Sequence, residues 1–208
     1  MPSRKSSEAK QDSRRAISPA SWASLSTGLP ASVSIALLFP RIESGALAAI
    51  NGHCLGGALE LAITCDLRIC AAGAKLGMPP AKLGLIYGHT GLRKFLDAVG
   101  LARTKELFLT GRNFAATRAE SIGLVHEVVS DEELEAASVA LAAEVAANAP
   151  LSMRGNKSAI ELLNSNPELS EQQEAGLIAL RESCFASEDF REGVAAFAEK
   201  RKPVWKGR

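Results

Sequence analysis

The chain has 208 residues, 47% of them hydrophobic, and a formal net charge of +1 at pH 7. A chain of this length and apolar content can bury one core, and its near-zero charge gives no reason to expect a nucleic acid partner. Its four cysteines form no CxxC pair, and no histidine stands at metal-ligand spacing. This pattern indicates reduced thiols, a cytoplasm-like compartment and no metal site.

Residues 1–34 differ from the rest of the chain because they are rich in serine and basic residues and lack a hydrophobic period. We therefore expect a disordered or atypical N-terminal segment that ends near residue 40. A transit peptide to an organelle matrix is the alternative, although Glu8 and Asp12 count against it. The apolar run at residues 33–39 is shorter than the about 20 residues that span a bilayer, so it predicts an interior segment and no membrane partner.

The next stretch combines an apolar strand, a glycine-rich turn and an apolar helix that contains one carboxylate. Residues 48–50 indicate a buried strand, Gly56 and Gly57 the start of a helix, and residues 58–63 its buried continuation. Glu60 follows Gly57 by three positions, so both lie on one face of the helix. The free N–H of Gly57 at the positive end of the helix and the carboxyl of Glu60 are therefore directed into the same space. That arrangement is typical of a site for a developing oxyanion. From these residues alone, a buried structural carboxyl beside a close helix contact is an equal alternative.

Four motifs follow one another along the chain. Residues 48–66 match the pattern A-x-I-N-G-x-x-x-G-G-G-x-E-L-A-x-x-C-D, with Ala58 in place of the third glycine. Residues 76–84 match much of F-G-x-P-E-x-x-L-G, and residues 100–112 and 196–203 contain two further motifs. From about Gly45 to Arg208 the chain therefore resembles the crotonase superfamily, also called the enoyl-CoA hydratase/isomerase superfamily.

The resemblance implies an α/β fold of the crotonase (ClpP-like) type, built from ββα units wound into a spiral. Only the C-terminal part of that core is expected here, at residues 41–130, followed by a helical oligomerisation region at residues 131–208. The resemblance also implies an acyl-CoA thioester substrate, no cofactor besides the CoA of the substrate, and a homotrimer or homohexamer.

The resemblance further assigns roles to individual residues. The N–H of Gly57 would be one of two donors to the thioester oxygen of an enolate-like intermediate, and Glu60 would handle a proton. Phe197 and Lys200 would contact the adenine and the phosphates of a neighbouring subunit's coenzyme. The alternative for the three cations at residues 200–202 is a solvated helix end. The expected substrate contacts are Leu55, Gly56, Pro79, Pro80, Leu83, Phe197 and Lys200.

Two departures from the family pattern bear on the chemistry. Family hydratases have a second glutamate where this chain has Pro80, which cannot transfer a proton, so the pattern argues against water addition by two carboxylates. Nothing in residues 1–44 resembles the family's G-x-D loop, which supplies the second oxyanion donor. Loss of one such donor typically costs about 2.7–4 kcal/mol of transition-state stabilisation, so we expect weak activity unless another chain supplies it.

Tyr87 is the only tyrosine in the chain, and it follows the L-G-x-x segment as in family decarboxylases of methylmalonyl-CoA and ethylmalonyl-CoA. This local resemblance favours decarboxylation of a short alkylmalonyl-CoA over enoyl-CoA hydration, with Gly57, Glu60 and Tyr87 as catalytic residues. A half-buried packing tyrosine is the alternative at this position. For the whole chain, the alternative is a non-catalytic or truncated paralogue that binds acyl-CoA or joins mixed oligomers.

The remaining sequence predicts mostly helices. Ser130 with Glu133 matches a capping box, Asn166-Pro167 predicts the start of a later helix, and Ser187 predicts the start of the last one. Apolar spacing predicts helices at residues 92–99, 103–109 and 117–122 and a strand at residues 124–129.

Overall fold

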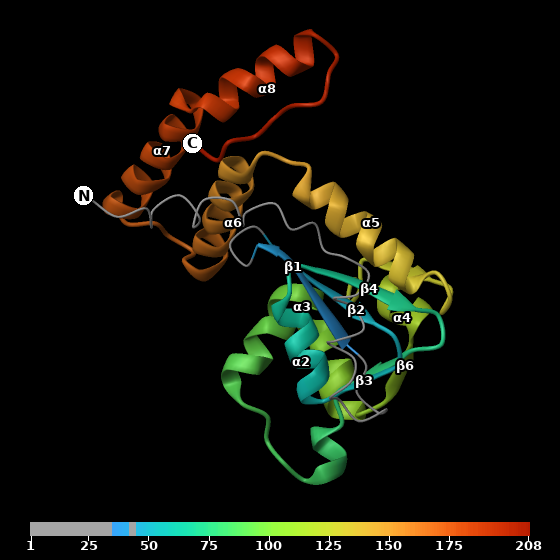
Figure 1. Ribbon diagram of the computed structural model, residues 1–208. Coiled ribbons are helices and arrows are strands. Elements are labelled where there is room, and N and C mark those ends of the chain that lie inside the picture. The colour runs from blue at the N-terminus through green and yellow to red at the C-terminus, as the bar shows by residue number, and fades with distance from the viewer. Residues whose placement is uncertain (1–34, 42–44) are drawn as a thin grey trace, which may run out of the picture.

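The computed structural model describes residues 35–41 and 45–208, so the serine-rich segment 1–34 lies outside the described residues. Short strands and helices alternate in the first part of the fold, which consists of β1 (Ile35–Arg41), β2 (Gly45–Ile50), β3 (His53–Leu55), α2 (Gly57–Thr64), β4 (Leu67–Ala71), β5 (Lys75–Gly77), the 3₁₀ helix η2 (Pro80–Leu83), α3 (His89–Thr110), β6 (Asn113–Ala115), α4 (Ala116–Ser121) and β7 (Glu127–Val129) (Figure 1). The second part is helical and consists of α5 (Leu134–Ala146), α6 (Pro150–Ser165), α7 (Glu171–Ala186) and α8 (Glu188–Ala198).

A four-stranded sheet in the order β1-β2-β4-β7 forms the centre of the fold. β1 is antiparallel to β2, whereas β2, β4 and β7 are parallel, with Ile50 opposite Cys70. In a smaller sheet, β3-β5-β6, Leu55 at the end of β3 lies opposite Gly77 at the end of the parallel strand β5. The start of α2 and the segment that follows β5 therefore leave the sheet at the same edge.

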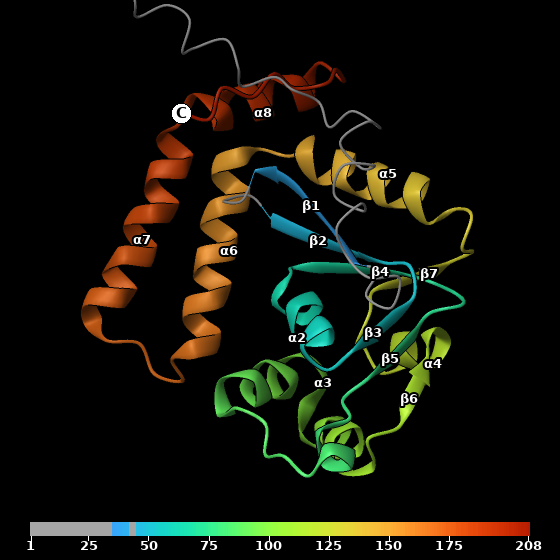
Figure 2. The same cartoon turned by 60° about the horizontal axis from the view of Figure 1, so that its bottom comes forward.

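Alternate residues of β2 are buried on opposite faces of the central sheet. Leu47 and Ala49 belong to a cluster with residues of α5, whereas Ala48 and Ile50 belong to a cluster with residues of α2 and α3. Figure 2 shows α5 on one side of the sheet and α2 and α3 on the other. Because both faces are covered, the strand is a continuous apolar run, as predicted for residues 48–50. The predicted α/β class is confirmed.

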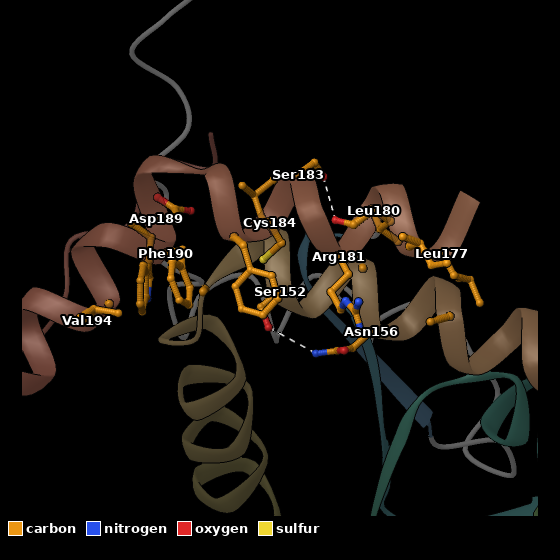
Figure 3. A pocket seen from close by; sticks show the side chains of 18 of the residues that line it. Ser152, Asn156, Leu177, Leu180, Arg181, Ser183, Cys184, Asp189, Phe190 and Val194 are labelled. Atoms are coloured by element: carbon orange, nitrogen blue, oxygen red, sulfur yellow. Dashed lines mark hydrogen bonds between the residues drawn. The ribbon is translucent and has the colours of Figure 1, made fainter. Parts of the chain in front are cut away.

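The helices α6, α7 and α8 form an arm beside the sheet (Figure 2). In the segment after α8, Trp205 Nε1 donates to the Ala147 carbonyl at the end of α5 at 2.7 Å. Lys157 Nζ of α6 donates to Asp66 Oδ2 at 2.8 Å, so these two bonds connect the C-terminal region to α5 and to the loop before β4. An open, mainly apolar groove of about 910 Å³ lies between the arm helices. Figure 3 shows this groove with Leu177, Phe190 and Val194 among the residues that line it.

Within the described ranges, no single helix is long and apolar enough to cross a bilayer. Among the helices of these ranges, α5 and α6 reach that length and apolarity as a pair, and they are bent by 99° relative to each other.

Two predicted helix starts are wrong. Helix α7 begins at Glu171 rather than after Asn166-Pro167, because Ser170 and Gln173 form a capping box. In it, Ser170 Oγ accepts from the Gln173 N–H at 3.3 Å and Gln173 Oε1 accepts from the Ser170 N–H at 2.9 Å. Helix α5 begins only at Leu134, because Ser130 donates to the Glu133 carboxylate at 2.7 Å and caps no backbone N–H.

Other boundaries also differ from prediction. The helices predicted at residues 92–99 and 103–109 are both parts of α3, which is kinked at Gly100, where φ is 73°. The strand predicted at residues 124–129 is confined to β7, because Leu124 and Val125 are buried in the preceding turn. The predicted start of the last helix is confirmed, since Ser187 Oγ accepts from the Phe190 N–H at 3.0 Å.

Candidate active site

The candidate site begins at the N-terminus of α2. Gly56 is the N-cap residue with a φ of 59°, a left-handed conformation that favours glycine, and its N–H donates to the Gly77 carbonyl at 2.9 Å. Gly57 is exposed, and its N–H is one of the four at a helix start that have no acceptor within the helix. Because it lies at the positive end of α2, this N–H can bind an oxygen that gains negative charge. Leu55, which ends β3, is half-buried beside this turn.

The carboxylate of Glu60, in the first turn of α2, is contacted on both oxygens. The Tyr87 hydroxyl donates to Oε2, and Lys94 Nζ lies 3.9 Å from Oε1. The same ammonium donates to Thr64 Oγ1 at 2.8 Å, and Thr64 Oγ1 donates to the Glu60 backbone carbonyl at 2.8 Å. Residues from α2, from α3 and from the loop between η2 and α3 therefore hold one side chain in place.

Tyr87 is half-buried, and its ring packs against α3. Its centroid lies 5.5 Å from that of Phe108, which in turn makes an edge-on contact of 5.1 Å with Phe95. Burial, the hydrogen bond to Glu60 and the negative charge of Glu60 together raise the pKa of Tyr87 to about 12. The phenol is therefore protonated at neutral pH and acts as a hydrogen-bond donor.

The segment after β5 places Pro80 in the protein interior. Pro80 is the first residue of η2 and is buried, Pro79 is half-buried, and the side chain of Leu83 is 70% exposed. A pyrrolidine ring therefore occupies the position at which the family pattern has a glutamate. Among the described residues, Glu60 is the only acidic group whose charge acts on the Tyr87 hydroxyl.

Phe197 and Lys200 do not meet the other predicted site residues within one chain. Phe197 is 88% exposed near the end of α8, and Lys200 follows the helix with a φ of 55°. Figure 1 shows α8 at one end of the molecule, away from α2. The role of both residues at a neighbouring subunit's coenzyme stays a prediction.

Three residues of the site were missed from the sequence, namely Thr64, Gly91 and Lys94. Lys94 and Thr64 are 30 positions apart and meet only because α2 packs on α3. Gly91 lies against both Tyr87 and Glu60, because a Cβ there would come within 3.0 Å of each side chain. Gly91 lies just before the helix predicted at residues 92–99, so no sequence signal marked it as a helical glycine.

No group of three His, Cys, Asp or Glu residues that could hold a metal ion occurs in the part of the chain that the structure describes. All four cysteines are free. Burial raises the pKa of Cys54 and of Cys70 to about 12, so neither thiol is a nucleophile at neutral pH.

Comparisons with known proteins agree with this architecture. The family model of enoyl-CoA hydratase/isomerase matches residues 37–208. A Bacillus subtilis protein named "Probable enoyl-CoA hydratase" is 42% identical over 175 residues, which make up 82% of this chain and 67% of that protein. Carnitinyl-CoA dehydratase of Salmonella typhi is 35% identical over 172 residues, or 80% of this chain and 65% of that enzyme. The crystal structure of enoyl-CoA hydratase from Bacillus anthracis matches with a TM-score of 0.70 and 37% identity, over 78% of this chain and 62% of that one.

The chain spans 59–67% of the length of three curated relatives that it matches. None of the three proteins named above is called a decarboxylase, so the local resemblance to decarboxylases stays a prediction. The match of the family model over residues 37–208 and the shared fold show that the chain belongs to the enoyl-CoA hydratase/isomerase, or crotonase, family.

Proposed function

We propose that this protein is a lyase that acts on a CoA thioester through an enolate, and that it decarboxylates a short alkylmalonyl-CoA. The observation that supports this reaction is the hydrogen bond from the Tyr87 hydroxyl to Glu60, at a site where Pro80 replaces the second carboxylate of a hydratase. Decarboxylation suits such a site, because loss of CO₂ generates the enolate without a base.

In the proposed reaction, the thioester oxygen accepts a hydrogen bond from the Gly57 N–H. The bond between the α-carbon and the carboxylate carbon breaks, CO₂ leaves, and the electron pair forms the enolate that Gly57 stabilises. The protonated Tyr87 then donates its proton to the α-carbon and regains one from water. Glu60 orients the phenol before this transfer, because its Oε2 accepts from the Tyr87 hydroxyl, and the bond forms again once the phenol is reprotonated.

We also propose that the CoA moiety is bound between subunits of a homotrimer or homohexamer, with no cofactor besides CoA. The apolar groove along the arm supports association, because exposed apolar faces of this size are usually covered. A stable monomer at micromolar concentration in light scattering would contradict this proposal.

The free cysteines support the prediction of a cytoplasm-like compartment. The proposed contacts are Leu55, Gly56, Pro79, Pro80 and Leu83, with Phe197 and Lys200 from the neighbour.

Enoyl-CoA hydration is the second candidate, and the names of two relatives favour it, since one is called an enoyl-CoA hydratase and one a carnitinyl-CoA dehydratase. In that reaction Glu60 would activate the water and Tyr87 would donate a proton. A chain that binds acyl-CoA without turnover remains the alternative from another functional class.

The deciding experiment measures decarboxylation of methylmalonyl-CoA and ethylmalonyl-CoA and hydration of crotonyl-CoA by the same preparations. Tyr87→Phe should slow decarboxylation about a hundred-fold, a typical loss for a general acid. Glu60→Gln should abolish activity, and Pro80→Glu should raise crotonyl-CoA hydration. Brisk hydration by the wild type, unchanged in Tyr87→Phe, would refute decarboxylation.

A binding measurement tests the substrate class without turnover. In calorimetric titrations, acetyl-CoA should bind and acetate should not, because the Gly57 donor requires a polarised carbonyl and the CoA moiety supplies further contacts. Binding of acetyl-CoA without any turnover would favour the non-catalytic alternative. Equal affinity for both compounds, or affinity for neither, would exclude a CoA thioester site.

A further inference from the structure

Gly91 lies in the first turn of α3, at a position where its backbone gives no reason for glycine. It is buried, and it is not among the described glycines with positive φ. Glycine is the least favourable helix residue after proline, so alanine would suit this backbone better. The reason for glycine must therefore lie in the space around it.

That space is filled by the two side chains of the proposed proton-transfer pair. A Cβ at Gly91 would lie 2.6 Å from Cε1 of Tyr87 and 3.0 Å from Cδ and Oε1 of Glu60. The first distance is far below a van der Waals contact. The Tyr87 ring and the Glu60 carboxylate therefore both lie against the bare Cα of Gly91.

Neither side chain can yield to a methyl group without loss of their contact. The Tyr87 ring also packs against Phe108, whose neighbour Phe95 is fully buried. The Glu60 carboxylate lies between Tyr87 and Lys94. Side chains move more easily than the backbone of a packed helix, so the displacement falls on the bond between the Tyr87 hydroxyl and Glu60.

We propose that Gly91 is a positioning residue, whose missing side chain allows the Tyr87 phenol to meet the Glu60 carboxylate. Its effect on rate rests on the proposed function, whereas its effect on the Tyr87–Glu60 contact does not. A methyl group at position 91 would separate proton donor and carboxylate without touching the substrate.

The contact can be observed directly, because Tyr87 is the only tyrosine in the chain and its phenolate absorbance reports on it alone. In the wild type the ionisation midpoint should lie near the pKa of about 12. In Gly91→Ala it should fall by about half a unit or more, because the hydrogen bond and the charge of Glu60 no longer oppose ionisation. Gly176→Ala is the matched control, since a Cβ in that α7 position has nothing within 4 Å. It should leave both midpoint and kcat unchanged.

A stability cycle tests the steric pairing even where Gly91→Ala folds poorly. Tyr87→Ala removes the ring that the new methyl group would meet, so Gly91→Ala should destabilise less in the Tyr87→Ala background than in the wild type. Urea unfolding of the four proteins measures the difference. An equal cost in both backgrounds would overturn the proposal.

Kinetics separate this proposal from the proposed function. With a CoA thioester that the wild type converts, Gly91→Ala should lower kcat at least about ten-fold and leave KM nearly unchanged, as expected for a misplaced proton donor. If the wild type converts no thioester, the proposed function fails, and the titration and the stability cycle still decide the role of Gly91. If the wild type is active and Gly91→Ala keeps its midpoint and its kcat, the proposal fails and the function stands.

Discussion

Replacement of Lys94 by methionine should slow the reaction far more than it destabilises the fold. Lys94 Nζ lies 3.9 Å from Glu60 Oε1, and the two side chains are 40% and 30% exposed. At this distance two unit charges attract by about 1 kcal/mol in water, and exposed pairs contribute about 0.2–1 kcal/mol once the ordering of both side chains is included. The free energy of unfolding should therefore fall by less than about 1 kcal/mol.

The rate should respond more strongly, because Lys94 and Thr64 determine where the carboxylate of Glu60 stands. A displacement of about 1 Å in a catalytic group can cost about a hundred-fold in rate, or about 2.7 kcal/mol of transition-state stabilisation. Lys94→Arg should keep part of the rate, because a guanidinium can still contact Glu60 and Thr64. Thr64→Val should lower the rate as well, since it removes the acceptor 2.8 Å from Lys94 Nζ.

The assay combines kcat and KM for the preferred CoA thioester with urea unfolding of the same preparations. Arg93→Met is the matched control, because this neighbouring cation of α3 pairs with Asp97 at 2.9 Å and not with Glu60. It should lose a similar amount of stability and keep its kcat. Wild-type kcat in Lys94→Met, or an equal loss in Arg93→Met, would refute the reasoning.

Three further predictions concern stability, pH and the arm. Ser138→Ala should raise the free energy of unfolding in urea by about 1 kcal/mol or more, because its buried hydroxyl has no partner among the described residues and such a group costs about 1–3 kcal/mol; a loss of stability would contradict this. Glu60→Gln should move the ionisation midpoint of Tyr87 from about 12 toward the ordinary 10. The pKa of Tyr87 is raised in the folded state, so the stability gained from its protonated phenol is complete below pH 10 and is lost as the pH rises to 12. The free energy of unfolding, measured across that window, should therefore fall more steeply in the wild type than in Glu60→Gln. Lys200→Gly should raise the free energy of unfolding by about 1 kcal/mol, because glycine adopts the left-handed conformation of this position without strain. The same variant should bind acyl-CoA more weakly in calorimetry, and unchanged affinity would exclude Lys200 from the coenzyme site.

The elements whose signals are local could be predicted from the sequence. The strand at residues 48–50 and the helix that begins at Gly57 follow from apolar runs and a glycine pair, and these signals need no information about the rest of the fold. The start of α7 could not be chosen this way, because Asn166-Pro167 and Ser170 both satisfy the rules for a helix start. The reciprocal bonds of Ser170 and Gln173 decide between them.

The candidate site shows the same limit. The spacing of Gly57 and Glu60 placed both on one helix face, and the resemblance to family decarboxylases singled out Tyr87. The contact between Glu60 and Tyr87 joins residues 27 positions apart, so it depends on how the loop before α3 returns to α2. The contributions of Lys94 and Gly91 depend on the same packing of α3 on α2, for which the sequence offers no periodic signal.

The contacts of Glu60 also bear on the choice between the two candidate reactions. A phenol whose pKa is about 12 can only donate a proton at neutral pH, so any general base in this pair must be Glu60. Its Oε2 already accepts from Tyr87, and its Oε1 faces Lys94. Water addition would require Glu60 to take a proton from water while Tyr87 and Lys94 both stabilise its charged form. Decarboxylation requires no base, because Glu60 only has to position the phenol until Tyr87 gives its single proton to the α-carbon, and the hydrogen bond forms again when water reprotonates the phenolate. The proposed decarboxylation therefore uses Glu60 as a hydrogen-bond acceptor and not as a base, which suits a carboxylate that already contacts Tyr87 and Lys94.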